Sequence, residues 1–197
     1  MSLLGNGLCA AKHHEDELIV GEAELAMERR FGASAGGLLL LQANLAITYE
    51  ALGRPEAVQM KRDVYNGYLQ LYGKEHRQTL RATNNYAASL IDQQRFREAR
   101  SLLRKTMPVA RRVFGESHEF TLKMRWSYAV ALYEHDGATL DDLREAVTAL
   151  EDLEQTTRRV LGGQHPLTVD IEGELQRARA ALAARETPPP PPPSKSV

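Results

Sequence analysis

Three histidines recur along the chain and are its most regular candidates for metal-binding chemistry. His76, His118 and His165 are 42 and 47 residues apart in a chain of 197 residues. If each begins an equivalent helix of a stacked array, the imidazoles lie about 10 Å apart, because packed helices are separated by roughly 8–10 Å. A zinc ion needs its nitrogen ligands at about 2.0–2.1 Å. We therefore expect these histidines to help start helices, and we predict no metal site.

The other reactive side chains form no known catalytic arrangement. The chain contains no H-E-x-x-H and no glycine-rich phosphate loop. Cys9 is the single cysteine, and it has no evident base nearby to activate its thiol. His13 and His14 stand beside two acids, which the exposed start of a helix explains. We predict that the protein is not an enzyme and uses no cofactor.

Composition and charge exclude further classes of protein. Lysine and arginine number 25 and aspartate and glutamate 26, so the net charge of -1 argues against a general nucleic-acid binder. The longest apolar run, Leu38 to Leu41, is far shorter than the ~18 residues that a membrane helix needs. The N-terminus has no basic segment ahead of its short apolar patch, so we expect no signal peptide and a cytoplasmic location.

The elements that must position any functional residue are predicted to be helices. Alanine, leucine, glutamate, arginine and glutamine dominate the sequence, and these are strong helix formers. Only Pro55, Pro108 and Pro166 precede the run Pro188–Pro193. Apolar residues recur at helical spacing. We predict helices over 12–30, 36–52, 55–72, 77–93, 96–113, 119–134, 140–161 and 166–185.

Four glycines, each following an aromatic residue or a leucine, mark an internal repeat of about 42 residues. They are Gly32, Gly73, Gly115 and Gly162. Each suits the left-handed residue that ends a helix. The last full unit is five residues longer, and there Thr139 and Asp142 can form a capping box. Stacking two-helix units buries apolar faces that one unit leaves exposed, so we predict an all-α fold, a right-handed α-solenoid.

The repeat divides the chain into three predicted regions. Residues 1–30 are expected to be a partial repeat helix with a frayed start. Residues 31–186 are expected to form the repeat array, with units at 31–73, 74–115 and 116–162 and a closing helix at 166–185. Residues 187–197 hold six consecutive prolines, which favour an extended and disordered tail.

The repeat resembles a known family. The segments GKEHRQTLRATNNYAASLIDQQRFREA (73–99) and LGGQHPLTV (161–169) are similar to the tetratricopeptide repeat (TPR) of the kinesin light chain type. The resemblance covers about residues 31–172. It implies a non-enzymatic scaffold or adaptor that holds an extended peptide of a protein partner in a concave groove. In this family the groove is lined by the first helix of each pair.

The resemblance also implies which residues line that groove. Positions four apart share one face of a helix. The expected line is Leu40, Asn44, Arg81, Asn85, Lys123, Ser127, Asp170 and Glu174. An asparagine amide can donate to a peptide carbonyl and accept from a peptide N–H, while Arg81 and Lys123 favour acidic residues of the peptide. The alternative is that these residues belong to an ordinary solvated face.

Two other functions stay open on the sequence. The chain could be an oligomerisation module or part of a longer array, since the predicted helix 12–30 carries an apolar side: Leu18, Ile19, Leu25 and Met27. Helix 96–113 could bind RNA or another anionic ligand, because residues 95–112 hold seven basic residues and one acid. Charge pairing with the acidic stretch 141–154 is the plainer explanation. Pro188–Pro193 could contact an SH3, WW or profilin-type groove.

Overall fold

The computed structural model describes residues 3–135 and 137–186, which form eight α-helices and no strand. The helices are α1 (Leu3–Phe31), α2 (Ala35–Ala51), α3 (Glu56–Tyr72), α4 (Arg77–Asp92), α5 (Phe96–Phe114), α6 (Glu119–Tyr133), α7 (Leu140–Leu161) and α8 (Pro166–Glu186). The predicted all-α class is confirmed. The bounds of α2 to α8 lie within one residue of those predicted.

The prediction for the first helix is wrong at its start. The expected helix began at residue 12, whereas α1 begins at Leu3. Ala10 and Ala11 continue the sequence toward the N-terminus, and alanine has the highest helix propensity. The helix therefore extends further than the onset of the apolar pattern indicated. None of the helices in the described part of the chain is long and apolar enough to cross a membrane.

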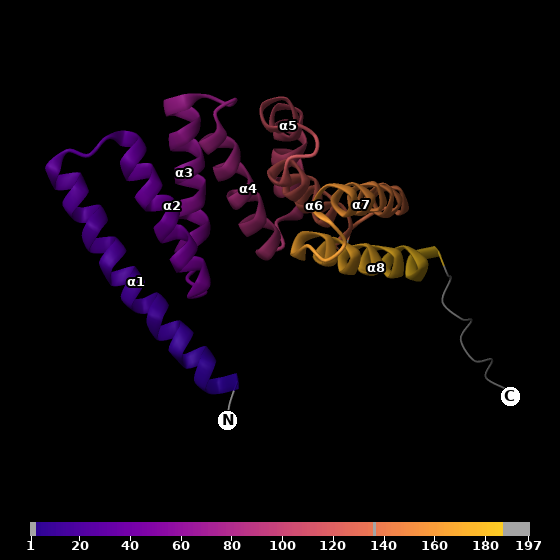
Figure 1. The fold of residues 1–197 in the computed structure, drawn as a ribbon, viewed down its shortest axis with the longest axis horizontal. Helices are drawn as coiled ribbons and strands as arrows, with labels where there is room; N and C mark the ends of the chain where they lie inside the picture. The colour runs from indigo at the N-terminus through magenta and orange to yellow at the C-terminus, as the bar shows by residue number, and fades with distance from the viewer. Residues whose placement is uncertain (1–2, 136, 187–197) are drawn as a thin grey trace, which may run out of the picture. The chain divides into compact units, whose positions relative to one another are not determined.

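Contacts between helices divide the chain into two compact units, Met1–Gly115 and Glu116–Val197. In unit 1, each helix from α1 to α4 packs on the next one in the chain. Figure 1 shows α1 to α4 side by side, each running opposite to its neighbour. Leu18 and Leu25 of α1 are buried with Leu45 of α2, and Tyr68 of α3 is buried with Ala82 of α4. The core of unit 1 therefore lies between successive helices.

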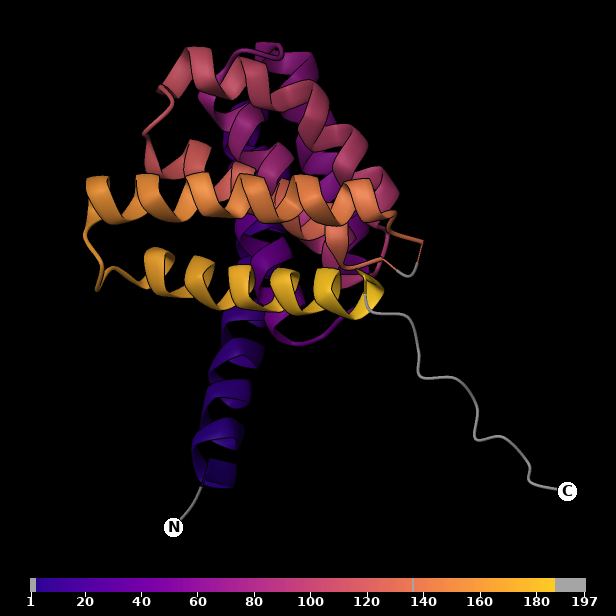
Figure 2. The ribbon, with the colours of Figure 1, turned by 90° about the vertical axis from the view of Figure 1, so that its right-hand side faces the viewer.

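Unit 2 consists of α6, α7 and α8, which all contact one another. Figure 2 shows α7 and α8 as two long antiparallel neighbours. The side chains of Leu122, Leu132, Leu150, Leu153 and Ile171 are fully buried and come from all three helices. Unit 2 thus has an apolar core of its own.

Small residues recur at buried positions of the repeat. Six alanines at equivalent repeat positions are at most 3% exposed: Ala46, Ala57, Ala87, Ala99, Ala129 and Ala146. A methyl side chain lets two helix backbones come close without leaving a void. The recurrence of alanine in the sequence therefore reports helix packing.

Local signals in the sequence set the helix ends. Gly73, Gly115 and Gly162 follow α3, α5 and α7 with φ of 80°, 102° and 92°, a region that favours glycine. At the start of α7, the Thr139 hydroxyl accepts a hydrogen bond from the Asp142 N–H at 3.1 Å, and the Asp142 carboxylate accepts from the Thr139 N–H at 3.1 Å. The predicted capping box is confirmed.

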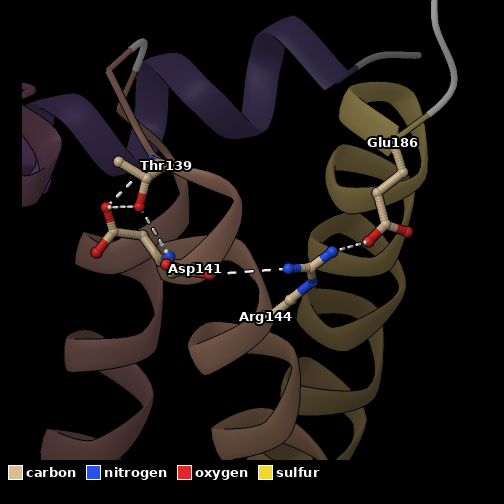
Figure 3. Close-up of polar contacts among 5 residues, drawn as sticks. Thr139, Asp141, Arg144 and Glu186 are labelled. Carbon is tan, nitrogen blue, oxygen red and sulfur yellow. Dashed lines mark hydrogen bonds and ion pairs between the residues drawn. The ribbon is translucent and has the colours of Figure 1, made fainter.

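The first turns of α7 are also tied to the end of α8. Arg144 lies 3.7 Å from Asp141 in its own helix and donates a 2.9 Å hydrogen bond to Glu186 (Figure 3). Glu186 is the last residue of α8. The ion pair therefore joins the beginning of one helix to the end of its antiparallel neighbour.

Candidate functional site

A hollow of about 150 Å³ lies among α2, α3 and α4 in unit 1, and we call it the α2–α4 cleft. Four residues predicted for the groove line it together: Leu40 and Asn44 from α2, and Arg81 and Asn85 from α4. The other lining residues were not expected from the sequence: Ala43, Ile47, Lys61, Val64, Tyr68, Gln78 and Ala82. Most of these side chains are apolar, so nothing in the sequence distinguishes them from core residues. Lys61 lies on the second helix of its pair, whereas the groove was expected on the first helices.

Helix periodicity explains why these side chains meet. Leu40, Asn44 and Ile47 recur at spacings of four and three, which places them on one face of α2. Leu45 and Ala46 point into the core of unit 1 and are buried. Leu40 and Ile47 are 49% and 51% exposed, so the cleft has an apolar side that solvent reaches.

The α4 side of the cleft is polar. Arg81 and Asn85 are exposed and lie one helical turn apart, next to the half-buried Gln78. Among the described residues, the Arg81 guanidinium has no hydrogen-bond or ion-pair partner, and neither do the side-chain amides of Asn44 and Asn85. Their donors and acceptors are therefore open to a bound molecule.

A buried cation forms part of the cleft lining. Lys61 is only 6% exposed, and its ammonium donates to the Ser89 hydroxyl at 2.8 Å and to the Glu50 carboxylate. The Ser89 hydroxyl in turn donates to Glu50 at 2.6 Å. Burial, together with the nearby charge of Glu50, raises the pKa of Asp92, while Lys61 opposes this rise. An ammonium has three donor hydrogens, and two of those on Lys61 have partners here.

The other four predicted groove residues belong to unit 2. Lys123 is exposed and forms an ion pair with Glu119 at 2.7 Å. Ser127 is half-buried, and Asp170 is exposed. Glu174 differs from these, because it is only 3% exposed and its carboxylate has partners inside unit 2.

The Glu174 carboxylate is held by three donors. The Tyr133 hydroxyl donates to one of its oxygens, while the Trp126 indole and the Arg177 guanidinium donate to the other at 3.4 Å and 2.6 Å. Burial and the hydrogen bond to Glu174 together raise the pKa of Tyr133 well above its usual range. These contacts give Glu174 a structural role within unit 2.

The repeated histidines start helices, as predicted. His76 and His118 are the N-cap residues of α4 and α6, and their rings accept from the backbone N–H of Gln78 and Phe120. The His165 ring likewise accepts from the Leu167 N–H at 3.2 Å. Within the described ranges, no group of three or more histidine, cysteine, aspartate or glutamate residues is arranged to hold a metal ion.

Comparison with known proteins agrees with the repeat. Residues 78–139 match the family model for the tetratricopeptide repeat. Two crystal structures are similar to this chain, and both are 22% identical to it. They show the "nearly identical TPR-like repeats" of the Podosopora anserina putative kinesin light chain, and one of them carries a substitution. They cover 93% of this chain and 88% of their own, with TM-scores of 0.72 and 0.71. No curated protein sequence matches the chain.

The chain therefore contains tetratricopeptide repeats and has the fold of kinesin light chain-like TPR arrays. This is the repeat type that its own sequence resembles. Tetratricopeptide repeats generally act as scaffolds for protein–protein interaction, and residues 78–139 of this chain match that repeat.

Proposed function

We propose that the chain is a cytoplasmic scaffold that binds an extended, acidic peptide segment of a partner protein in the α2–α4 cleft. The observation that supports this most directly is the open guanidinium of Arg81. It lies in a hollow whose other exposed polar groups, Asn44 and Asn85, also lack partners among the described residues.

The lining of the cleft suits such a peptide. The amides of Asn44 and Asn85 can each donate to a peptide carbonyl and accept from a peptide N–H, which requires no particular side chain. Arg81 can pair with an acidic side chain through two parallel hydrogen bonds. Leu40 and Ile47 offer apolar surface for a neighbouring side chain.

Lys61 adds to the preference for an acidic peptide. Its charge is shared with Glu50, but one of its three ammonium hydrogens has no partner among the described residues. A carboxylate that enters the hollow could accept this hydrogen while pairing with Arg81.

In unit 2 we propose that Lys123, Ser127 and Asp170 contact peptide as well. Lys123 would exchange its ion pair with Glu119 for an acidic residue of the peptide, and the exposed Asp170 would favour a basic one. Glu174 is left out of this proposal, because its buried carboxylate is already used by Tyr133 and Arg177.

Two finer proposals concern other partners. The first is self-association through α1. Leu18 and Leu25 already pack on α2, so only Ile19 and Met27 of the four residues first considered are exposed. The second is contact between Pro188–Pro193 and an SH3, WW or profilin-type groove, a segment that lies outside the described residues.

A peptide array tests the function proposed for the cleft. The full chain is applied to immobilised extended peptides that differ in the number and spacing of acidic residues. Wild type should bind a subset rich in aspartate or glutamate, and Arg81→Glu combined with Asn85→Ala should lose that subset. Reversing one charge at a contact of this kind typically costs at least about tenfold in affinity.

The matched control is Arg62→Glu, which makes the same charge change on the exposed side of α3, away from the lining residues. It should bind like wild type, and circular dichroism should show the same helix content in every variant. If the double variant keeps the full set of peptides, the cleft is not the binding site.

A further inference from the structure

Helix α5 carries a second basic surface that is separate from the cleft. Its residues share one face of the helix and line an open hollow of about 490 Å³: Arg97, Arg100, Ser101, Arg104 and Lys105. The opposite face holds the residues that pack into unit 1: Phe96, Ala99, Leu103 and Ala110. We call the first group the α5 basic surface. None of its members lines the α2–α4 cleft.

The charge of this surface is not compensated by α5 itself. Glu98 is the one acidic residue of the helix, and the Arg95 guanidinium donates to both of its oxygens at 2.8 Å. These hydrogen bonds hold the pKa of Glu98 below its usual range. Among the described residues, Arg97, Arg104 and Lys105 have no hydrogen-bond or ion-pair partner. The surface therefore remains positively charged.

The acidic helix of the chain has partners elsewhere. Glu151 of α7 accepts from Arg179 of α8 at 2.7 Å, and Glu154 accepts from Arg158 at 2.7 Å. Asp152 accepts from Arg125 of α6. These three acids thus each have a basic partner inside unit 2.

We propose that the α5 basic surface docks an acidic segment of a partner protein. Arg97 and Arg104 are exposed and seven residues apart, so they lie on one face of the helix about two turns, or roughly 11 Å, apart. Carboxylates seven residues apart on an acidic helix have the same spacing. Arginine pairs with carboxylates through a planar fork of donors, so each of these side chains can hold a carboxylate in two parallel hydrogen bonds.

The same surface is poorly suited to nucleic acid. None of its lining residues is aromatic, so bases have no platform on which to stack. Binding to phosphates alone depends on how many of them the protein neutralises, and four cations on a chain of net charge -1 offer few such contacts. Charge complementarity therefore favours a protein segment.

Fluorescence anisotropy with three labelled probes tests this proposal on the full chain. The probes are an oligo-glutamate peptide, an oligo-glutamine peptide and an oligouridine RNA. Wild type should bind oligo-glutamate, with an affinity that falls as salt rises, and should not bind oligo-glutamine. Arg97→Glu combined with Arg104→Glu should weaken oligo-glutamate binding by about tenfold or more.

The controls separate this surface from the cleft. Because the cleft is itself proposed to bind acidic peptides, affinities are also compared in a chain that already carries Arg81→Glu: it should still bind oligo-glutamate, and adding Arg97→Glu with Arg104→Glu should weaken that binding about tenfold or more. Arg62→Glu changes neither site and should bind like wild type. Because Arg97 and Arg104 are exposed, the double variant should fold, and Arg97→Gln with Arg104→Gln provides a milder form.

Three results would overturn the proposal. The first is no binding of oligo-glutamate, or equal binding by the double variant. The second is binding that only Arg81→Glu abolishes, which assigns the acidic probe to the cleft. The third is tighter binding of oligouridine that the double variant loses, which makes the surface a nucleic-acid site.

Discussion

At the scale of single residues, Glu174 shows how a buried carboxyl group is accommodated inside a helical repeat. Its two oxygens accept hydrogen bonds from Tyr133, Trp126 and Arg177. Removing a charge from water is costly, and an ion pair with additional hydrogen bonds is what offsets that cost. Glu174 therefore needs its full set of donors to be tolerated in the core of unit 2.

We expect Tyr133→Phe to lower the free energy of unfolding by about 1–3 kcal/mol, because the carboxylate loses a donor while it stays buried. Urea denaturation followed by circular dichroism measures this. Tyr72→Phe is the control, since Tyr72 is 44% exposed and its ring stacks on Tyr68 and His76 without needing its hydroxyl. Equal effects of the two substitutions would show that Glu174 does not depend on Tyr133.

At the scale of elements, short local signals decide where several helices begin. Imidazole rings cap α4 and α6, a serine hydroxyl caps α2, and the Thr139–Asp142 box caps α7. Each cap satisfies a backbone N–H that has no partner within its helix. These signals act over two or three residues, so the local sequence can indicate the helix starts that carry them.

The capping box of α7 should contribute measurably to stability. Thr139→Ala removes the hydroxyl that accepts from the Asp142 N–H, and we expect it to cost about 0.5–2 kcal/mol. Thr139→Ser keeps a hydroxyl at the N-cap and should cost much less. Thermal melts of the three proteins measure the difference. If serine and alanine destabilise equally, the threonine methyl group, and not the cap, is the important feature.

At the scale of the whole molecule, the two units each have a buried core and contacts between neighbouring helices. In repeat proteins, stability is approximately a sum of the contributions of single repeats and of the interfaces between neighbouring repeats. The loss of one core side chain should therefore act mainly on its own unit. This separates the present fold from a globular domain with a single shared core.

Ile171→Ala tests that expectation, because Ile171 is fully buried in unit 2. Trimming a buried isoleucine to alanine typically costs about 2–5 kcal/mol. Amide hydrogen exchange by mass spectrometry should show lost protection in α6, α7 and α8, with much smaller changes in α2, α3 and α4. Uniform loss across all the helices would mean that the chain unfolds as a single cooperative unit.

The sequence alone determined the helical repeat and part of the cleft. Histidine and threonine at helix starts and glycine at helix ends indicated where helices begin and end, because capping is an interaction between residues close in sequence. Leu40, Asn44, Arg81 and Asn85 could be chosen together because residues four apart share a helix face, and the repeat aligns those faces in successive units.

Only the tertiary structure decided which polar residues are buried and paired. Glu174 occupies a predicted groove register, yet Tyr133 and Trp126 of α6 enclose its carboxylate in unit 2. Lys61 reaches the cleft because Glu50 and Ser89, on two other helices, supply its partners. Burial of a charge depends on donors and acceptors that lie far away in the sequence, and the spacing of residues along one helix does not encode them.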